Sequence, residues 1–235
     1  MKTILVDVDT QIDFMAPEGS LYVPASPSVI PDIRKILQQA DLRGVPILGS
    51  VDSHGYDSWE FQDNGGPFPT HCVKGQPGWT RFHHDLPART RFVAMQEPVD
   101  GTVSTLAGES SHATGNRTLS AADLASEAID GVGIYFEKEV YSLFSNPVAE
   151  IIIETLVDRL GGRDAVQFDV IGYCTGGYCV DEAAFGLAER GYRVRVLGYA
   201  TAAIGGNDGL AKSKAALTER GIQWIPHGAL EETAS

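Results

Sequence analysis

The sequence predicts a three-layer α/β/α sandwich with a mostly parallel, Rossmann-like central sheet. Short apolar runs rich in β-branched residues alternate along the chain with segments whose apolar positions recur at helical spacing. This alternation is typical of parallel strands joined by right-handed crossovers, with helices on both faces. The chain has 235 residues, 43% hydrophobic and 21% charged, which suits a globular protein. With no internal repeat and no linker, residues 1–235 are predicted to form one domain.

The first three elements predict a β-α-β opening. Thr3–Val8 is a short apolar run and is expected to be a strand. Ser28–Leu42 carries apolar positions at helical spacing and is expected to be a helix. Val45–Val51 is again apolar, and Pro46 is tolerated near the start of a strand.

The same alternation continues to the end of the chain. The later predicted strands are Arg91–Met95, Gly133–Lys138, Val166–Tyr173, Tyr192–Tyr199 and Ile222–Ile225. The later predicted helices are Pro147–Leu160, Val180–Arg190 and Gly209–Arg220.

Two segments interrupt this pattern. Tyr56–Gly78 is rich in glycine, proline and aromatic residues and has no period, while Glu97–Ser120 is dominated by small and polar residues. We interpret 97–120 as a loop insertion. A lid over a pocket, a contact between subunits and a simple connection are all open for it, because lengthening a loop costs little.

Charge and cysteine content exclude several classes of protein. There are 18 Lys and Arg against 31 Asp and Glu, a net charge of −13, which disfavours nucleic-acid binding. The longest apolar runs are too short to span a bilayer, and acidic Asp7 comes too early for a signal peptide, so we expect a cytoplasmic protein with no membrane partner. Cys72, Cys174 and Cys179 are an odd number, which argues against a disulfide scaffold and leaves packed and catalytic thiols open.

Candidate functional residues follow the predicted strands, because an open parallel sheet binds ligands at the carboxyl ends of its strands. After the first strand come Asp7, Asp9 and Gln11, which would share one side if the extended conformation continued. A carboxylate here would equally serve as a helix N-cap or lie in solvent.

The second predicted strand is followed by a candidate metal site. Asp52 and His54 are two residues apart, and the irregular loop beyond them contains His71. One carboxylate and two imidazoles suit a first-row divalent metal. Glu60 and Asp57 lie in the same loop and are candidates for a further oxygen ligand. The alternative is that both histidines are ordinary hydrogen-bonded loop residues.

Two later strands end in a cation and a thiol. Lys138 lies between Glu137 and Glu139, so it either pairs with these neighbours or lowers the pKa of a nearby thiol. The glycine-containing turn before Cys179 would place this thiol at a helix N-terminus, where backbone N–H groups favour a thiolate and a developing oxyanion. The turn is neither a P-loop nor a GxGxxG motif.

Together these motifs resemble the nicotinamidase branch of the isochorismatase-like cysteine hydrolase family. The similarity covers most of the chain. The segments that carry it are Val8–Phe14, Asp52 to His54, His71–Gly78, Lys138 to Phe144 and Thr175–Val180.

The resemblance implies a metal-assisted cysteine amidohydrolase that converts nicotinamide to nicotinate and ammonia, a reaction of NAD salvage. Asp9, Lys138 and Cys179 would form the catalytic triad through a Cys thioester. Backbone N–H groups of Thr175 and Cys179 would form the oxyanion hole. The implied metal ligands are Asp52, His54, His71 and Glu60, with zinc the first candidate and iron or manganese also suitable. The implied aromatic residues around the substrate ring are Phe14, Phe68 and Tyr178.

This sequence departs from the family pattern at the nucleophile turn. Gly172 to Cys179 is one residue longer than the common Gly-x-Ala-Thr-Asp-x-Cys and has Gly176 where Asp is usual. Cys174 is therefore a rival nucleophile. Two alternatives stay open: the same chemistry on another small amide or carbamoyl compound, and a catalytically silent binding or scaffold relative. Members of the family often self-associate, which makes a homo-oligomer a further expectation.

Overall fold

The computed structural model describes residues 1–108 and 116–226. In this part of the chain nine strands form one sheet in the order β5-β4-β3-β6-β2-β1-β7-β8-β9. The strands are β1 Lys2–Val8, β2 Ile47–Asp52, β3 Arg89–Val93, β4 Thr102–Ala107, β5 Arg117–Ser120, β6 Val132–Lys138, β7 Val166–Thr175, β8 Val194–Ala203 and β9 Gln223–Ile225.

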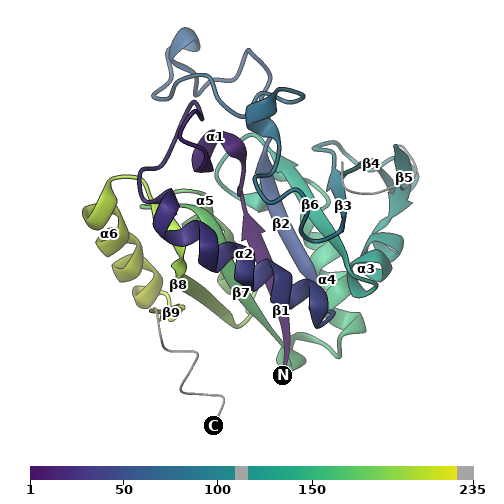
Figure 1. Cartoon of the computed structure of the whole chain (residues 1–235). Helices are drawn as coiled ribbons and strands as arrows, with labels where there is room; N and C mark the ends of the chain where they lie inside the picture. The colour runs from purple at the N-terminus through teal and green to yellow at the C-terminus, as the bar shows by residue number, and fades with distance from the viewer. Residues whose placement is uncertain (109–115, 227–235) are drawn as a thin grey trace.

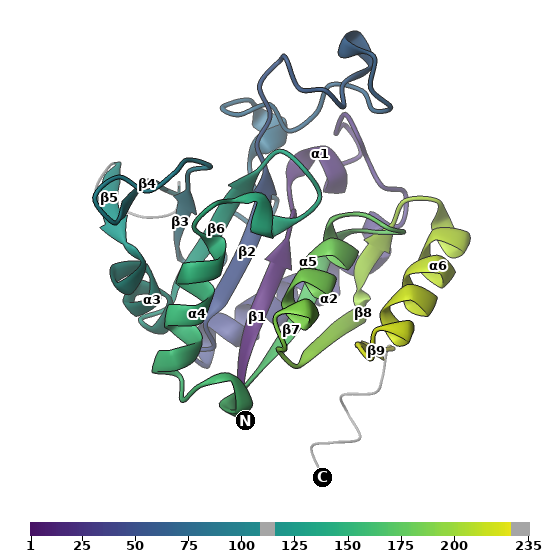
Figure 2. The same ribbon diagram turned by 180° about the vertical axis from the view of Figure 1, so that it is seen from behind.

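Helices cover both faces of this sheet, which confirms the predicted three-layer α/β/α sandwich. In Figure 1, α2 crosses the near face, and Figure 2 shows α4 and α5 on the opposite face. The helices are α1 Ile12–Met15, α2 Ser26–Leu42, α3 Ala121–Ile129, α4 Ala149–Arg159, α5 Cys179–Glu189 and α6 Gly206–Glu219. None of the described helices is long and apolar enough to cross a membrane.

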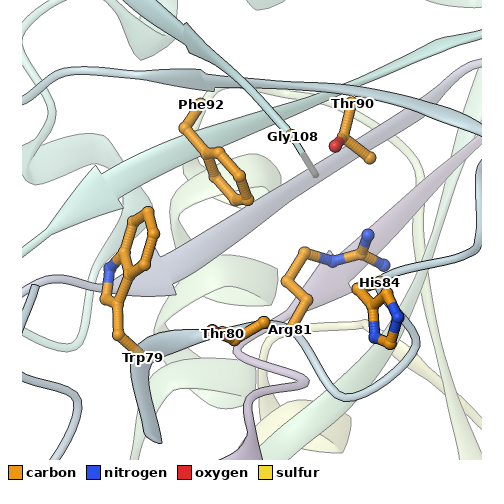
Figure 3. Close-up of a pocket in the computed structure, with 7 residues that line it drawn as sticks. All are labelled: Trp79, Thr80, Arg81, His84, Thr90, Phe92 and Gly108. Carbon is orange, nitrogen blue, oxygen red and sulfur yellow. The ribbon is translucent and has the colours of Figure 1, made fainter. Parts of the chain in front are cut away.

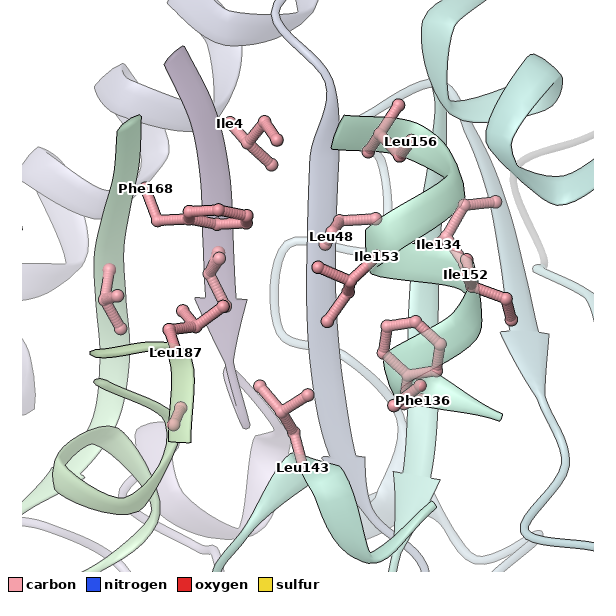
Figure 4. Packing of buried hydrophobic residues seen from close by; sticks show 14 of the residues in the cluster. Ile4, Leu48, Ile134, Phe136, Leu143, Ile152, Ile153, Leu156, Phe168 and Leu187 are labelled. Atoms are coloured by element: carbon pink, nitrogen blue, oxygen red, sulfur yellow. The ribbon is translucent and has the colours of Figure 1, made fainter. Parts of the chain in front are cut away.

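Each face of the sheet has its own apolar core. One cluster joins the sheet to α3, α4, α5 and α6, and Figure 4 shows Ile4, Leu48 and Phe168 of the strands packed with Ile153 and Leu187 of the helices. The other cluster lies under α2 and includes the helix residues Ile33 and Leu37. Burial on both faces explains why the central strands have nearly continuous apolar sequences.

The predicted loop at 97–120 is partly wrong. Residues of β4 and β5 pair antiparallel with each other, and β4 pairs antiparallel with β3, so these two strands extend the edge of the sheet. Residues 109–115 of the predicted loop lie outside the described part of the chain. These edge strands are rich in Thr and Ser, and only Val103 and Leu119 among their residues belong to the core. Because so few of their side chains are apolar, the hydrophobic period does not reveal them. That residues 1–235 form a single domain stays a prediction.

Helix α3 was not predicted, although the sequence carries a start signal for it. Ser120 accepts a hydrogen bond from the backbone N–H of Asp123, and the Asp123 carboxylate accepts one from the Ser120 N–H. This reciprocal pair is a capping box, readable in sequence as Ser-x-x-Asp before an apolar helix.

Candidate active site

The candidate residues meet where the chain leaves the middle of the sheet. Asp9 follows β1, Asp52 ends β2, Lys138 ends β6, and Cys179 begins α5 after β7. Strand β1 lies between β2 and β7, so successive connections leave it in opposite directions. In open α/β sheets, such a switch point at the carboxyl ends of the strands forms a crevice for ligands.

Lys138 is at the centre of this group. Its Nζ lies 2.8 Å from Asp9 Oδ2 and 3.4 Å from Cys179 Sγ, and it also donates a hydrogen bond to Asp52 Oδ1. Asp52 and Lys138 are direct neighbours in the β2–β6 register, which explains why these two side chains meet. All four residues are buried. Lys138 therefore does not pair with Glu137, whose partner is Lys74 at 2.7 Å.

The backbone turns at Asp9, which separates this carboxylate from its neighbours in sequence. Asp9 has φ of 47°, a left-handed conformation that ends the extended chain. Asp7, Asp9 and Gln11 therefore do not share one side, contrary to the prediction from strand alternation. The Asp9 N–H donates to Ser50 O at 3.0 Å, and Ser50 Oγ donates to Asp9 Oδ1 at 2.7 Å.

Gln11 binds backbone groups next to the cluster around Lys138. Its side-chain Nε2 donates to the backbone carbonyls of Asp52 and Trp79, both at 2.9 Å. Its Oε1 accepts from the Asp52 N–H at 2.8 Å. Gln11 thereby fixes the end of β2, from which the Asp52 carboxylate extends.

One lysine here contacts two carboxylates and a thiol, and burial together with these unequal charges shifts the pKa values of the group. Burial raises the pKa of Asp9 to about 6, with Asp52 adding to the increase and Lys138 opposing it. Burial also raises the pKa of the Cys179 thiol, again against the effect of Lys138. Burial alone would lower the pKa of Lys138, but Asp52 and Asp9 raise it well above its usual range. The resting group thus contains a charged lysine, a protonated thiol and a carboxylate that titrates near neutral pH.

Cys179 is the first residue of α5, so its backbone N–H has no partner within the helix. The turn before it is held from two other positions. Gly176 N–H donates to Ser213 Oγ at 2.5 Å, and Gly177 N–H donates to the Asp181 carboxylate. Ser213 Oγ also donates to Asp181 Oδ2 at 2.5 Å. The N–H groups of Gly176 and Gly177 are therefore both used to support the turn itself.

The two residues before the glycines differ in where they lie. Cys174 lines the same pocket as Cys179, while Thr175, the predicted oxyanion-hole residue, is not among the lining residues. Thr175 pairs with Ala203 of β8, whereas Cys174 falls at an irregularity in the β7–β8 register. The peptide bond between Tyr173 and Cys174 is cis. Burial raises the pKa of the Cys174 thiol well above its usual range.

A second group adjoins Asp52 and has the composition of a metal site. Ligand atoms of Asp52, His54, Glu60 and His71 all lie within 4.8 Å of one another, and all four residues are buried. Glu60 Oε1 lies 2.8 Å from His54 Nε2 and 3.3 Å from His71 Nε2. Two carboxylates and two imidazoles suit zinc, iron or manganese.

The histidines are oriented for this role by their other ring nitrogens. His71 Nδ1 lies 2.7 Å from Pro69 O, and His54 Nδ1 lies 3.3 Å from Ser58 Oγ. His54 Nε2 is buried and faces the Glu60 carboxylate. Such outer contacts fix a ring so that its second nitrogen faces a metal. The four residues therefore fit a divalent ion, whereas Asp57, the other candidate in this loop, is exposed and lies outside the group.

The neighbouring carboxylates also act on the pKa of His54. Burial on its own lowers the pKa of His54, but contacts with Asp52 and Glu60 raise it to about 9. Burial raises the pKa of Asp52, but Lys138 and His54 outweigh this effect and lower it below its usual range. The carboxylates of this group therefore favour a positive charge beside them.

A pocket with aromatic walls joins the thiol to the metal-type group. The predicted residues Phe14, Phe68 and Tyr178 all line it, together with Cys179 and metal-type residues. The Phe14 and Phe68 rings lie edge-on to His71, at 5.7 and 6.0 Å between centroids. A flat ring could pack between these walls while a group attached to it reaches Sγ.

Sequence reasoning missed several residues of this region. Ser50, Asp181 and Ser213 act through hydrogen bonds that depend on distant parts of the chain and leave no local signal. Leu21 and Ile204 also line the pocket but lie in segments with no motif. Tyr141 was signalled by the segment that follows Lys138; its ring lies 5.4 Å from that of Tyr178.

A separate pocket lies near β3 and the loop after Trp79 (Figure 3). Figure 3 shows Trp79 and Phe92 on one side and Arg81, His84 and Thr90 on the other. Arg81 is buried and belongs to a charge cluster at the strand before Asp9, in which its Nη2 donates to Asp7 Oδ2 at 2.9 Å.

Comparison with known proteins supports the family resemblance. Residues 3–100 match the model of the isochorismatase domain. A search of the curated proteins finds no match. Similar solved structures include a pyrazinamidase of Pyrococcus horikoshii in complex with zinc, with 23% identity, 96% of this chain and 99% of that chain covered and a TM-score of 0.66.

Two further structures have the same fold. The nicotinamidase of Bacillus subtilis has 20% identity, covers 96% of this chain and 100% of its own, and has a TM-score of 0.65. The N-carbamoylsarcosine amidase of Thermoplasma acidophilum has 22% identity, 96% coverage of both chains and a TM-score of 0.59. The family model thus supports the resemblance over residues 3–100, and the solved structures share the fold over nearly the whole chain.

Proposed function

We propose that the protein is a metal-assisted cysteine amidohydrolase that converts nicotinamide and water to nicotinate and ammonia. One observation carries this proposal: Lys138 Nζ contacts Asp9, Asp52 and Cys179 at once. This contact supports the assignment of a base, a cation and a nucleophile that act together beside the metal-type group. In this assignment Asp9, Lys138 and Cys179 are the catalytic residues.

Asp9 has the properties of the general base. A base works best when its pKa is near the pH of the reaction, and burial raises the pKa of Asp9 to about 6. At neutral pH its carboxylate can therefore accept the Cys179 proton as Sγ attacks the carboxamide carbon. Lys138 offsets the negative charge that this transfer leaves on the sulfur.

The tetrahedral intermediate places negative charge on the former carbonyl oxygen. The free N–H of Cys179 at the start of α5 is one donor for it. We assign the second donor to Cys174 rather than Thr175, because Cys174 lines the pocket and Thr175 is paired with β8. Gly176 and Gly177 are excluded because their N–H groups bond to Ser213 and Asp181.

Proton return completes the cycle. Asp9, now protonated, gives its proton to the amide nitrogen, the C–N bond breaks, and ammonia leaves a thioester on Cys179. Asp9 then takes a proton from water, whose oxygen attacks the thioester carbon. The C–S bond breaks, nicotinate is released, and the proton returns to Cys179.

Asp52, His54, Glu60 and His71 would hold the divalent metal ion. When bound, the ion would act as a Lewis acid toward the pyridine nitrogen of the substrate and would so orient the ring. The chain's own contribution is a pair of fixed imidazoles and the aromatic walls Phe14, Phe68 and Tyr178. Zinc is the first candidate, and the small-molecule substrate is the partner that this site requires.

Ammonia release tests the proposal. Purified protein with added zinc should release ammonia from nicotinamide, and a chelator or the substitution Cys179→Ala should abolish the release. A panel of carbamoyl compounds and other small carboxamides should be run in parallel, because the fold is shared with an N-carbamoylsarcosine amidase. Release from another panel member alone would keep the mechanism and replace the substrate, whereas no release from any would contradict the proposal.

A further inference from the structure

An apolar crevice adjoins the pocket that contains Cys179. Three side chains, Leu21, Phe68 and Ile204, line both cavities, so the two adjoin across this shared wall. The crevice encloses about 640 Å³ including its open mouth, against about 290 Å³ for the pocket at the thiol. The other residues that line it are Tyr22, Val23, Pro24, Ala25, Ala203, Gly205 and Gly206.

The lining of the crevice limits what it can bind. It contains apolar side chains, glycines and one tyrosine, and no lysine, arginine, aspartate or glutamate. In a chain of net charge −13, such a lining offers no charged side chain to a phosphate or carboxylate, and it favours the burial of uncharged apolar surface. The adjoining pocket, by contrast, contains the carboxylates Asp52 and Glu60. The polar chemistry and the apolar surface thus lie on the two sides of a shared wall.

We propose that the crevice is a specificity subsite and that the amide substrate class includes molecules with an uncharged apolar substituent seated in it. This inference rests on the proposed function, since it takes Cys179 as the reacting group. Phe68 lies at the boundary between the two spaces, because it lines both, and its ring contacts His71 and Tyr178 of the pocket at the thiol. A substrate whose carboxamide lies at Cys179 can extend past this ring into the crevice.

Ala25 offers a substitution that acts on the crevice alone. It lines the crevice but not the pocket at the thiol, and its side chain is exposed just before α2. Only its backbone carbonyl is used in the described chain, as the acceptor from Ser28. Ala25→Trp would fill the crevice, and Ala25→Ser is the matched control of nearly unchanged size.

The first measurement uses alkylation of Cys179 and does not depend on the substrate's identity. Full-length zinc-loaded protein is treated with iodoacetamide or with N-butyl iodoacetamide, and the modified peptide is identified by mass spectrometry. Burial of part of the butyl chain should make the second reagent react about tenfold faster. Ala25→Trp should reduce this preference to less than about twofold with the iodoacetamide rate unchanged, and Ala25→Ser should retain it.

The second measurement compares turnover of nicotinamide with that of a nicotinamide carrying an uncharged butyl group on the ring. Ala25→Trp should lower kcat/KM for the butyl compound about tenfold and leave that for nicotinamide unchanged. A wild-type protein with no amidase activity but with the alkylation preference intact would overturn the proposed function and leave the crevice as a binding site.

Three results would overturn the crevice proposal itself. The first is an equal rate of the wild-type protein with both alkylating reagents, and the second is a preference that persists in Ala25→Trp. Size-exclusion chromatography gives the third: a dimer that Ala25→Trp dissociates, with no change in reagent preference, would identify the crevice as a contact between two copies of the chain.

Discussion

Two buried charge clusters are centred two residues apart, on Asp7 in β1 and on Asp9 just after it, and they differ in how the charges are balanced. Around Asp7, one arginine serves one carboxylate: Arg81 Nη2 donates at 2.9 Å, with Tyr135 OH at 2.8 Å and Thr10 Oγ1 at 3.1 Å on the same oxygen. Around Asp9, one lysine faces two carboxylates and the Cys179 thiol.

The difference in charge balance suits the cluster around Asp7 to stability and the cluster around Asp9 to reactivity. A buried ion pair with matched charges fixes the local structure, and removing one partner is costly. In the second cluster the surplus of negative groups, together with burial, leaves Asp9 with a pKa of about 6 and the Cys179 thiol protonated. That cluster can exchange a proton near neutral pH, as base catalysis needs.

The largest expected effect is at the thiols. Cys179→Ala should reduce amide hydrolysis at least about 1,000-fold, because no covalent intermediate can form. Cys174→Ala is the matched control, since Cys174 lines the same pocket but does not contact Lys138 in the described hydrogen bonds. Initial rates of ammonia release measure both, and the reverse pattern would make Cys174 the nucleophile.

Lys138→Met would break the reactive cluster. Among the leading influences on the pKa of Cys179, Lys138 is the one that lowers it. Because the variant loses this charge, the midpoint of thiol alkylation should move to higher pH. We expect kcat to fall about 100-fold. The pH dependence of iodoacetamide alkylation is the measurement, and an unshifted midpoint would contradict the electrostatic role of Lys138.

Arg81→Met would break the balanced cluster instead. It leaves the buried Asp7 carboxylate without its cation and should cost about 3–5 kcal/mol in the free energy of unfolding. Urea denaturation measures this loss. The alkylation midpoint of Cys179 should stay at its wild-type pH, and a shift as large as that in Lys138→Met would show that the two clusters are not independent.

His54→Ala tests the metal-type group beside the reactive cluster. Removing one of its four ligand residues should weaken zinc affinity by at least about tenfold and raise KM for nicotinamide. His84→Ala is a control, because His84 lies outside the group. Equal zinc content in the two purified variants would remove His54 from the site.

The smallest effect is expected from Ser50→Ala. The Ser50 hydroxyl donates to Asp9 Oδ1 and so stabilises the ionised carboxylate, which lowers its pKa. Without it the pKa of Asp9 rises, and the base is ionised only at higher pH. The activity of the wild type should fall as pH drops through about 6, and this limb should move up by about one unit in the variant. A profile identical to that of the wild type would argue against Asp9 as the base.

Regions of the fold also differ in how well they could be predicted from the sequence. The central strands were predictable because burial on both faces gives them apolar runs, as in Thr3–Val8, and the long helices because their buried face gives an apolar period, as in Ser28–Leu42. Strands β4 and β5 were not, because their polar edge sequences have no apolar period. The residues that end strands could be placed at one edge of the sheet from topology alone.

Pairings across strands were beyond the sequence. That Asp52 serves both Lys138 and the metal-type group follows from the β2–β6 register, which no local pattern specifies. The separation of Asp7 from Asp9 depends on a left-handed backbone at a residue other than glycine, which propensity disfavours. Both features arise from tertiary packing rather than from periodicity.

Trapping the acyl-enzyme tests the central claim most directly. Zinc-loaded protein is mixed with nicotinamide, quenched in acid during turnover, digested and analysed by mass spectrometry. The account predicts a nicotinoyl group on the peptide that contains Cys179, absent from Cys179→Ala. Ammonia release with no adduct on Cys179, or with the adduct on Cys174, would contradict it.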